Sequence, residues 1–224
     1  MAIYDKDFFE TYYRELENNR KKQRYEYLNF NNKLDQIEKR TAKKGNILDI
    51  GCSFGFFLDA ARQRGWTVAG IDLAEYAAKF AAQRFGIRVI NKTITEAEFE
   101  ENSFDVITMW NTIEHLINPK QELEHLSNFL KDDGLLVVST ANVDSLRARI
   151  EGRRWRIWIP PEHLSFFSPQ TMRNLFDKCG LVIFDQETAV PYEGCLRKLK
   201  IYNLLDKLKV SDNVVYYARK LEMN

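Results

Sequence analysis

The stretch Asn46–Asp72 reads NILDIGCSFGFFLDAARQRGWTVAGID and determines the fold expected for the chain. Apolar residues run from Ile47 to Ile50, a turn with two glycines follows, and apolar residues then recur at helical spacing. A second apolar run, Val68–Ile71, ends on Asp72. This order predicts a strand, a tight turn, a helix and a parallel second strand. Sheets of this kind bind ligands at the carboxyl ends of their strands.

The turn between the first strand and the helix predicts a nucleotide-like ligand. Gly51 and Gly55 allow the backbone to approach a ligand closely and to adopt positive φ angles, while the next helix directs its free amides into the crevice. Asp72 follows Gly51 by 72 − 51 = 21 residues, where a carboxylate can accept hydrogen bonds from both ribose hydroxyls. We therefore expect a ligand whose ribose hydroxyls are free.

Two residues of this stretch disfavour a dinucleotide. Ser53 stands where the G-x-G-x-x-G pattern has the middle glycine that admits a pyrophosphate. Asp49 adds a carboxylate just before the turn, where it would repel a phosphate. A cationic nucleoside without phosphate, such as S-adenosylmethionine, fits both residues better.

The same motifs carry a resemblance to a known family. LDIGCSFG resembles the first motif, D-x-G-x-G-x-G, of the class I S-adenosylmethionine-dependent methyltransferases, GID resembles their second, and WNTIEHLINP resembles their fourth. The resemblance covers about residues 45–190 and implies S-adenosylmethionine as the cofactor. It also implies an α/β fold with a doubly wound, seven-stranded Rossmann-like sheet of order 3-2-1-4-5-7-6, whose last strand is antiparallel. The cofactor-binding residues expected from the motifs and from this likeness are Asp49, Gly51, Ser53, Gly55, Asp72, Leu73, Thr93, Ile94, Trp110 and Asn111.

The positions of the remaining elements follow from periodicity and turn residues. Near Thr93, either Glu96 or Glu98 is an alternative candidate to cap a short helical turn. A turn is expected at 131–134, before the fifth strand. Further strands are expected at 87–90, 106–110, 135–139, 181–190 and 211–221. Helices are expected twice within 1–44 and at 74–84, 121–130, 145–150, 169–179 and 194–209, with Ser168 as an N-cap.

Length and composition predict one domain over 1–224, which the resemblance implies is a methyltransferase domain. Its expected parts are an N-terminal helical cap at 1–44, a core at 45–190 and a C-terminal helix and final strand at 191–224. Charges nearly balance, 33 basic against 32 acidic residues, which gives no general case for nucleic-acid or membrane binding. The three cysteines show no C-x-x-C spacing and no segment approaches 18 apolar residues. We expect a cytoplasmic monomer or homodimer without stable membrane insertion.

A segment at 143–167 is unusual in its residue types. Five arginines lie between Arg147 and Arg156, interleaved with Trp155, and Trp158 follows. Because the segment follows the carboxyl end of the fifth strand, we expect a lid over the crevice, whose arginines grip an anion and whose tryptophans stack on a ring. The acceptor-binding residues expected are Arg153, Arg154, Trp155 and Glu162. The alternative places the tryptophans in the core and the arginines in solvent.

Two histidines are candidates for a general base. His115 follows the fourth strand and His163 lies in the lid, and an imidazole titrates near neutral pH, where it can take a proton from a hydroxyl acceptor. The alternative is a structural histidine bound to a backbone carbonyl. The histidines and acids show no metal-ligand spacing along the chain, so no metal is expected.

The sequence of the expected lid resembles a smaller group within this family. GRRW and PPEHLSFFSP resemble bacterial methyltransferases of the type 11 and type 23 group, which includes ubiquinone O-methyltransferases and a subfamily tied to cell-surface sugars. This implies in-line methyl transfer to a hydroxyl or amine of a small or sugar-like, anionic acceptor. A nucleic-acid methyltransferase is an alternative, disfavoured by the charge balance and by MWNT where such enzymes carry N/D-P-P-Y/F. A non-catalytic cofactor-binding scaffold is another.

Overall fold

The structure is a computed structural model that describes residues 19–188 and 212–221. The strands are β1 (Asn46–Ile50), β2 (Thr67–Ile71), β3 (Val89–Ile90), β4 (Phe104–Trp110), β5 (Leu130–Ala141), β6 (Leu181–Thr188) and β7 (Asn213–Lys220). The helices are α2 (Arg20–Glu38), α3 (Phe56–Gln63), α4 (Glu75–Phe85), α5 (Pro119–Phe129), α6 (Leu146–Glu151) and α7 (Pro169–Lys178). Short 3₁₀ turns are η1 (Ile94–Glu96), η2 (Ile113–His115) and η3 (Gly152–Arg154).

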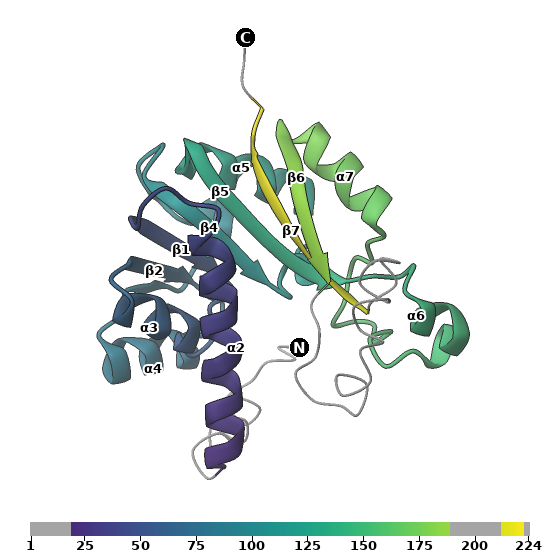
Figure 1. Ribbon diagram of the computed structural model, residues 1–224, viewed down its shortest axis with the longest axis horizontal. Helices are drawn as coiled ribbons and strands as arrows, with labels where there is room; N and C mark the ends of the chain where they lie inside the picture. Colours follow the sequence, from purple (N-terminus) through teal and green to yellow (C-terminus); the bar gives the residue numbers. More distant parts are fainter. Residues whose placement is uncertain (1–18, 189–211, 222–224) are drawn as a thin grey trace.

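The strands form one sheet in the order β3-β2-β1-β4-β5-β7-β6 (Figure 1). The first five strands run parallel to their neighbours, and β7 lies antiparallel between β5 and β6. The predicted order and the antiparallel last strand are confirmed. The carboxyl ends of β1, β2 and β4 therefore meet at one edge of the sheet.

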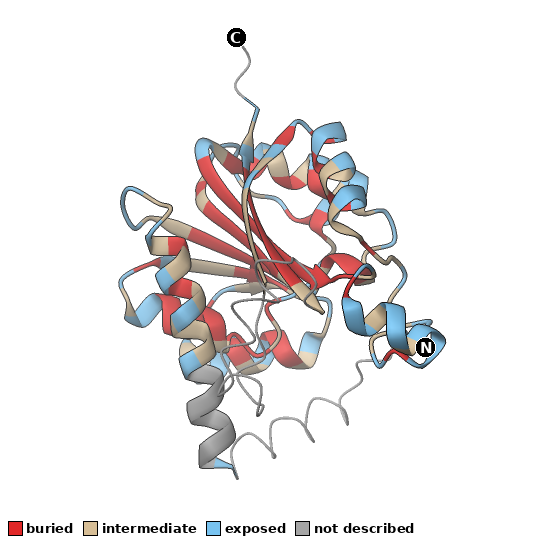
Figure 2. Cartoon of the chain, turned by 45° about the vertical axis from the view of Figure 1, so that its right-hand side comes forward, coloured by how far each residue is buried: buried red, intermediate tan, exposed pale blue. Residues whose placement is uncertain are grey.

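Side chains that alternate along each strand separate the core into two halves, one on each face of the sheet. In β1, Leu48 and Ile50 belong to a cluster that includes α5 and α7, whereas Ile47 belongs to a cluster that includes α2 and α3. Figure 2 shows the buried strands in the middle and the exposed outer faces of the helices on both sides. Because the central strands are covered on both faces, they are almost continuously apolar.

Helix ends follow the chemistry expected from the sequence. Ser168 accepts a hydrogen bond from the amide of Thr171 at 3.1 Å, with Pro169 at the first helical position, so the predicted N-cap of α7 is confirmed. Thr93 and Glu96 form a reciprocal capping box around η1, so Glu96, and not Glu98, caps this turn. Ser145, predicted to open a helix, is the N-cap of α6.

Two local predictions were wrong, and others lie outside the described residues. Residues 131–134 form part of β5, which begins at Leu130, where a turn had been expected; the strand shifts register between Phe104 and Val106 of its neighbour β4. The third strand is only Val89–Ile90, shorter than the predicted 87–90. The first N-terminal helix and the helix at 194–209 fall in the undescribed ranges. No helix within the described ranges is both long and apolar enough to cross a bilayer.

Candidate functional site

Three residues with positive φ angles alternate in the turn after β1. Gly51, Ser53 and Gly55 have φ angles of 68°, 48° and 75°. These are the three positions at which the first motif has glycine. All three have the left-handed backbone conformation that glycine adopts more easily than other residues, which explains the glycines of the motif. Ser53 adopts the same conformation with a side chain.

Gly51 also lies against the loop that follows β4. A Cβ atom at Gly51 would come within 2.6 Å of Thr112 Oγ1, and that hydroxyl donates to the carbonyl of Ile50 at 3.0 Å. The turn after β1 and the loop after β4 are therefore in direct contact, which places both at one site. A larger residue than glycine would separate them.

We expect Gly51→Ala to lower the free energy of unfolding by about 3 kcal/mol, from left-handed strain and from overpacking against Thr112. Gly86→Ala is the matched control, because Gly86 has a φ of 67° but nothing within 4 Å of its Cβ position. The control should lose only about 1 kcal/mol. Urea unfolding curves of both variants measure the difference, and equal losses would contradict the contact with Thr112.

Asp72, at the end of β2, holds this turn in place. Its carboxylate accepts hydrogen bonds from the backbone amides of Ser53 at 2.7 Å and of Ala74 at 2.8 Å. Burial raises the pKa of Asp72, and the two amide hydrogen bonds oppose that shift. Leu73 next to it is 70% exposed. Asp72 therefore lies at the predicted edge of the sheet, where it joins β1 to β2.

Asp49 is buried beneath α2. It pairs with Thr108 of β4 in the parallel sheet, and the Thr108 hydroxyl donates to its carboxylate at 2.6 Å. Burial raises the pKa of Asp49 to about 7, while the Thr108 hydrogen bond and the positive charge of Lys33 oppose the shift. Lys33 of α2 places its ammonium 4.0 Å from the ring centroid of Trp110. A cation thus already lies at this acidic, aromatic surface.

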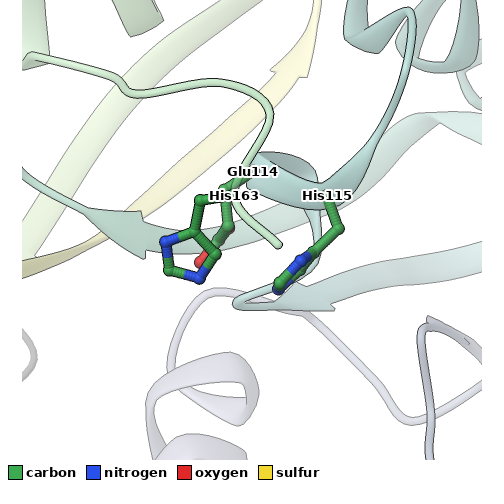
Figure 3. Close-up of side chains that lie close together, drawn as sticks. All are labelled: Glu114, His115 and His163. Carbon is green, nitrogen blue, oxygen red and sulfur yellow. The ribbon is translucent and has the colours of Figure 1, made fainter. Parts of the chain in front are cut away.

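The structure brings Glu114, His115 and His163 together, although residue 163 follows residue 115 by 163 − 115 = 48 positions (Figure 3). The imidazole rings of His115 and His163 meet edge to face with centroids 4.8 Å apart. Glu114 is 3% exposed and accepts a hydrogen bond from the Thr140 hydroxyl at 2.8 Å. The backbone carbonyl of Glu114 accepts hydrogen bonds from the amides of Leu164 and Ser165, which fastens the lid to η2.

Electrostatics inside this cluster follow from burial. Burial raises the pKa of the Glu114 carboxyl, and the Thr140 hydrogen bond opposes that shift. Burial also lowers the pKa of His163, and nearby His115 lowers it further. The sequence analysis expected no metal because histidines and acids are not spaced along the chain as metal ligands. Such spacing cannot reveal a cluster that forms when two distant segments meet, as Glu114 and His115 meet His163.

The comparison with known proteins decides the family. A family model described as a methyltransferase domain matches residues 9–186. The chain belongs to this methyltransferase family. The fold and the family imply S-adenosylmethionine as the methyl donor, so the predicted family and cofactor are confirmed.

Individual relatives agree with this assignment. A ubiquinone biosynthesis O-methyltransferase from Idiomarina loihiensis is 31% identical over 60% of this chain and 60% of its own length. One from Saccharophagus degradans is 26% identical over 85% of this chain and 83% of its own length. The matches thus leave between about a sixth and two fifths of these relatives uncovered. A solved Thermotoga maritima protein described as a possible histamine N-methyltransferase shares the fold, with 21% identity, 96% coverage of both chains and a TM-score of 0.68.

The residues of this methyltransferase at the β1–β2–β4 edge fit S-adenosylmethionine. Two carboxylates, the buried Asp49 and the half-buried Asp72, favour a cation and disfavour a phosphate. The indole Nε1 of Trp110 is buried and has no hydrogen-bond partner among the described residues. Trp110 packs against Phe57 of α3, with ring centroids 5.4 Å apart. The edge therefore offers negative charge, an aromatic wall and a turn that a ligand can approach closely.

Three other predicted cofactor residues have structural partners of their own. Thr93 is engaged in the capping box of η1, and Ile94 is 3% exposed. Asn111 has a φ of 52° and accepts a hydrogen bond from the Asn213 side chain at 2.8 Å. Their contacts with the cofactor stay predictions.

The lid of the methyltransferase contains a cavity of about 440 Å³. Trp155 is 2% exposed, and its Nε1 is buried without a hydrogen-bond partner among the described residues. Arg153 and Arg154 are exposed on η3, and Glu162 directs its backbone carbonyl to His115 Nδ1 at 2.8 Å. The cavity is lined by Val143, Ala148, Gly152, Arg153, Trp155 and Trp158. Trp155 is thus a wall of the lid, as in the alternative that places it in the core, whereas Trp158 is 46% exposed and stacks on Phe166.

Two neighbours of Asp49 were missed by the sequence analysis. Lys33 and Thr108 surround Asp49, yet neither belongs to a motif. For Thr108, the signal was available: a polar residue in the otherwise apolar strand β4, two positions before Trp110, faces the same side as Asp49. For Lys33, the sequence of the helix offered no such signal except that Lys33 lies next to the apolar stripe of Leu34 and Ile37.

Proposed function

We propose that this methyltransferase transfers a methyl group from S-adenosylmethionine to a hydroxyl of a small, anionic acceptor. The observation that carries the proposal is the position of the cluster of Glu114, His115 and His163. Thr112 contacts the turn at Gly51. The backbone carbonyl of Thr112 accepts a hydrogen bond of 3.0 Å from the backbone amide of His115. Groups able to take a proton therefore lie beside the turn expected to hold the cofactor.

Bound S-adenosylmethionine supplies an electrophilic methyl group on a positively charged sulfur. The protein's main contribution is to hold the acceptor oxygen in line with that methyl group, which contributes up to about 7–11 kcal/mol in favourable cases. The imidazoles of His115 and His163 accept the hydroxyl proton in this proposal. Backbone hydrogen bonds from Leu164 and Ser165 to the carbonyl of Glu114 hold the segment that carries His163 beside η2.

A hydroxyl is favoured over an amine because the relatives described above are O-methyltransferases by name. The anionic character of the acceptor rests on Arg153 at the lid cavity and on Arg154 beside it. The wall formed by Trp155 and Trp158 suits a ring. Phenolic acids and nucleotide sugars both combine a ring, a hydroxyl and negative charge, and the glycan acceptor expected from the sequence stays a proposal.

Incubation with methyl-labelled S-adenosylmethionine and a panel of phenolic acids, sugar phosphates, nucleotide sugars and amines tests the proposal. Mass spectrometry should show one labelled methyl group on a hydroxyl of an anionic compound. Transfer to amines alone would contradict the choice of atom. Tight cofactor binding without transfer to any compound of the panel or of a cell extract would favour the scaffold alternative.

We expect His163→Ala to lower turnover about tenfold or more and to leave cofactor affinity unchanged. The expected loss is smaller than the roughly 10²–10⁴-fold that a general base typically contributes, because His115, with its ring centroid 4.8 Å away, can replace His163 in part. Arg154→Ala should raise KM for an anionic acceptor and change kcat little. His125→Ala on α5 is the matched control, since its ring packs on Phe129. Steady-state kinetics and calorimetry with S-adenosylmethionine measure both effects, and unchanged kinetics in both variants would remove the role of the lid.

A further inference from the structure

The cluster of Glu114, His115 and His163 has a feature that a proton acceptor does not require. Each of the three residues offers one metal-ligating atom, and these atoms all lie within 4.8 Å of one another. They are two of the three histidines of the chain and one buried carboxylate. Two imidazoles and a carboxylate are the protein ligands of many catalytic zinc and iron sites.

Both rings are oriented as metal-binding histidines usually are. His115 Nδ1 lies 2.8 Å from the carbonyl of Glu162, and His163 Nδ1 lies 2.9 Å from the carbonyl of Ile157. Because a carbonyl oxygen only accepts hydrogen bonds, each Nδ1 carries the proton and each Nε2 carries the lone pair. A backbone carbonyl that holds Nδ1–H in this way fixes the ring and raises the basicity of Nε2 toward a metal.

Glu114 supplies a buried carboxyl group, whose ionised form a bound metal ion would stabilise. It accepts hydrogen bonds from the Thr140 hydroxyl and from its own backbone amide, and none of the ion pairs between described lysine, arginine and acidic residues includes it. A buried carboxylate without a cationic partner is costly, and a bound metal ion would compensate it. The Thr140 hydroxyl donates to one oxygen of this carboxylate, and a carboxylate oxygen can accept more than one contact, so these hydrogen bonds are compatible with a metal ion as a further partner.

The size of the cluster is close to that of a coordination sphere. Three atoms that all lie within 4.8 Å of one another can share a point no more than about 2.8 Å from each, and bonds to zinc are about 2.0–2.2 Å. Each ligand atom would move by about 0.6–0.8 Å, which small side-chain rotations provide. The backbone need not move, because the amides of Leu164 and Ser165 already join the lid to η2.

We propose that Glu114, His115 and His163 bind one first-row transition-metal dication, such as Zn²⁺ or Co²⁺. Two nitrogen ligands disfavour Mg²⁺ and Ca²⁺, which prefer oxygen. Three protein ligands leave at least one coordination position for another oxygen. We further infer that this oxygen is the hydroxyl of the acceptor, and this step rests on the proposed function. Coordination acidifies it, its proton passes to solvent water, and the imidazoles then act as ligands in place of proton acceptors.

Metal binding is measured on the tag-free full chain after dialysis against EDTA and removal of the chelator. Titration with Co²⁺ should give one equivalent per chain, with the visible absorption of a four- or five-coordinate ion, and Zn²⁺ should displace it. His163→Ala and Glu114→Gln should weaken Co²⁺ binding at least tenfold, whereas His125→Ala should bind as the unaltered protein does. Glu114→Gln is isosteric, and thermal unfolding of both variants is the check that they fold.

Several outcomes overturn the proposal: less than one equivalent of Co²⁺ in the unaltered protein, equal affinity in His163→Ala, loss of binding in His125→Ala, or binding of Mg²⁺ in preference to Co²⁺. Calorimetry with S-adenosylmethionine and turnover in EDTA separate this proposal from the proposed function. Methyl transfer that persists undiminished without metal overturns the metal's role and leaves the hydroxyl methyltransferase standing. Stoichiometric Co²⁺ binding without transfer to any acceptor supports the site and contradicts the proposed function.

Discussion

Asp72→Asn is expected to weaken the binding of S-adenosylmethionine by about 10²–10⁴-fold. The two charge-assisted hydrogen bonds that we propose between Asp72 and the ribose hydroxyls would contribute about 1.5–3 kcal/mol each, and the variant has no charged acceptor for them. The same change disturbs the turn, because the Asp72 carboxylate accepts from the amides of both Ser53 and Ala74. An asparagine has one acceptor oxygen, so one of these amides would face its NH₂ group.

Isothermal titration with S-adenosylmethionine measures this loss. Glu75→Gln is the matched control, because Glu75 lies three residues further on, is exposed and pairs with Lys79. Its cofactor affinity should equal that of the unaltered protein. An affinity of Asp72→Asn within threefold of the unaltered protein would show that the carboxylate does not hold the cofactor.

The predicted fold was confirmed where the information was local. Alternation in β1 directs Leu48 to one half of the core and Ile47 to the other. An apolar run between turn residues is typical of a strand that is covered on both faces. The start of β5 was missed because Lys131–Gly134 is polar and ends in glycine, as turns are. What holds it in the sheet is distant in sequence: Leu130 pairs with Phe104, and Lys131 forms an ion pair with Asp105 at 2.8 Å.

The candidate site, like the fold, was predicted where the information is local and missed where it is distant in sequence. Asp49, Gly51, Ser53 and Asp72 lie within one stretch of 27 residues, so their spacing alone places them at one edge of the sheet. The proximity of Glu114 to His163 could not be predicted, because it depends on hydrogen bonds between two segments that are far apart in the chain. Trp155 resembled a stacking surface by residue type, yet burial depends on how the lid folds on itself.

Asp49→Asn is expected to stabilise the protein above pH 7 by up to about 4 kcal/mol. The pKa of Asp49 is about 7 in the folded protein and 3.8 in its unperturbed state. Between these values the folded protein holds a proton that the unfolded chain has lost, so this group lowers stability as the pH rises from about 4 to about 7, and the full penalty remains above pH 7. Asparagine has no charge to desolvate and keeps an oxygen for the Thr108 hydroxyl.

The charged groups around Asp49 are Lys33 on α2, which favours its ionised form, and Asp72 beyond β2, which disfavours it. Burial raises the pKa of the Cys52 thiol, and the negative charges of Asp49 and Asp72 raise it further. Urea unfolding at pH 5 and pH 8 measures the predicted difference. Asp133→Asn, at an exposed position of β5, is the control and should not change the pH dependence.

The stabilised variant should bind the cofactor more weakly, because the carboxylate that destabilises the folded protein also attracts a cation. At pH 8 we expect about tenfold lower affinity for S-adenosylmethionine in Asp49→Asn. In the unaltered protein the cofactor should raise the melting temperature more at pH 8 than at pH 5, since only the ionised carboxylate attracts it. An equal rise at both pH values, or equal affinity in the variant, would show that the charge of Asp49 does not act on the cofactor.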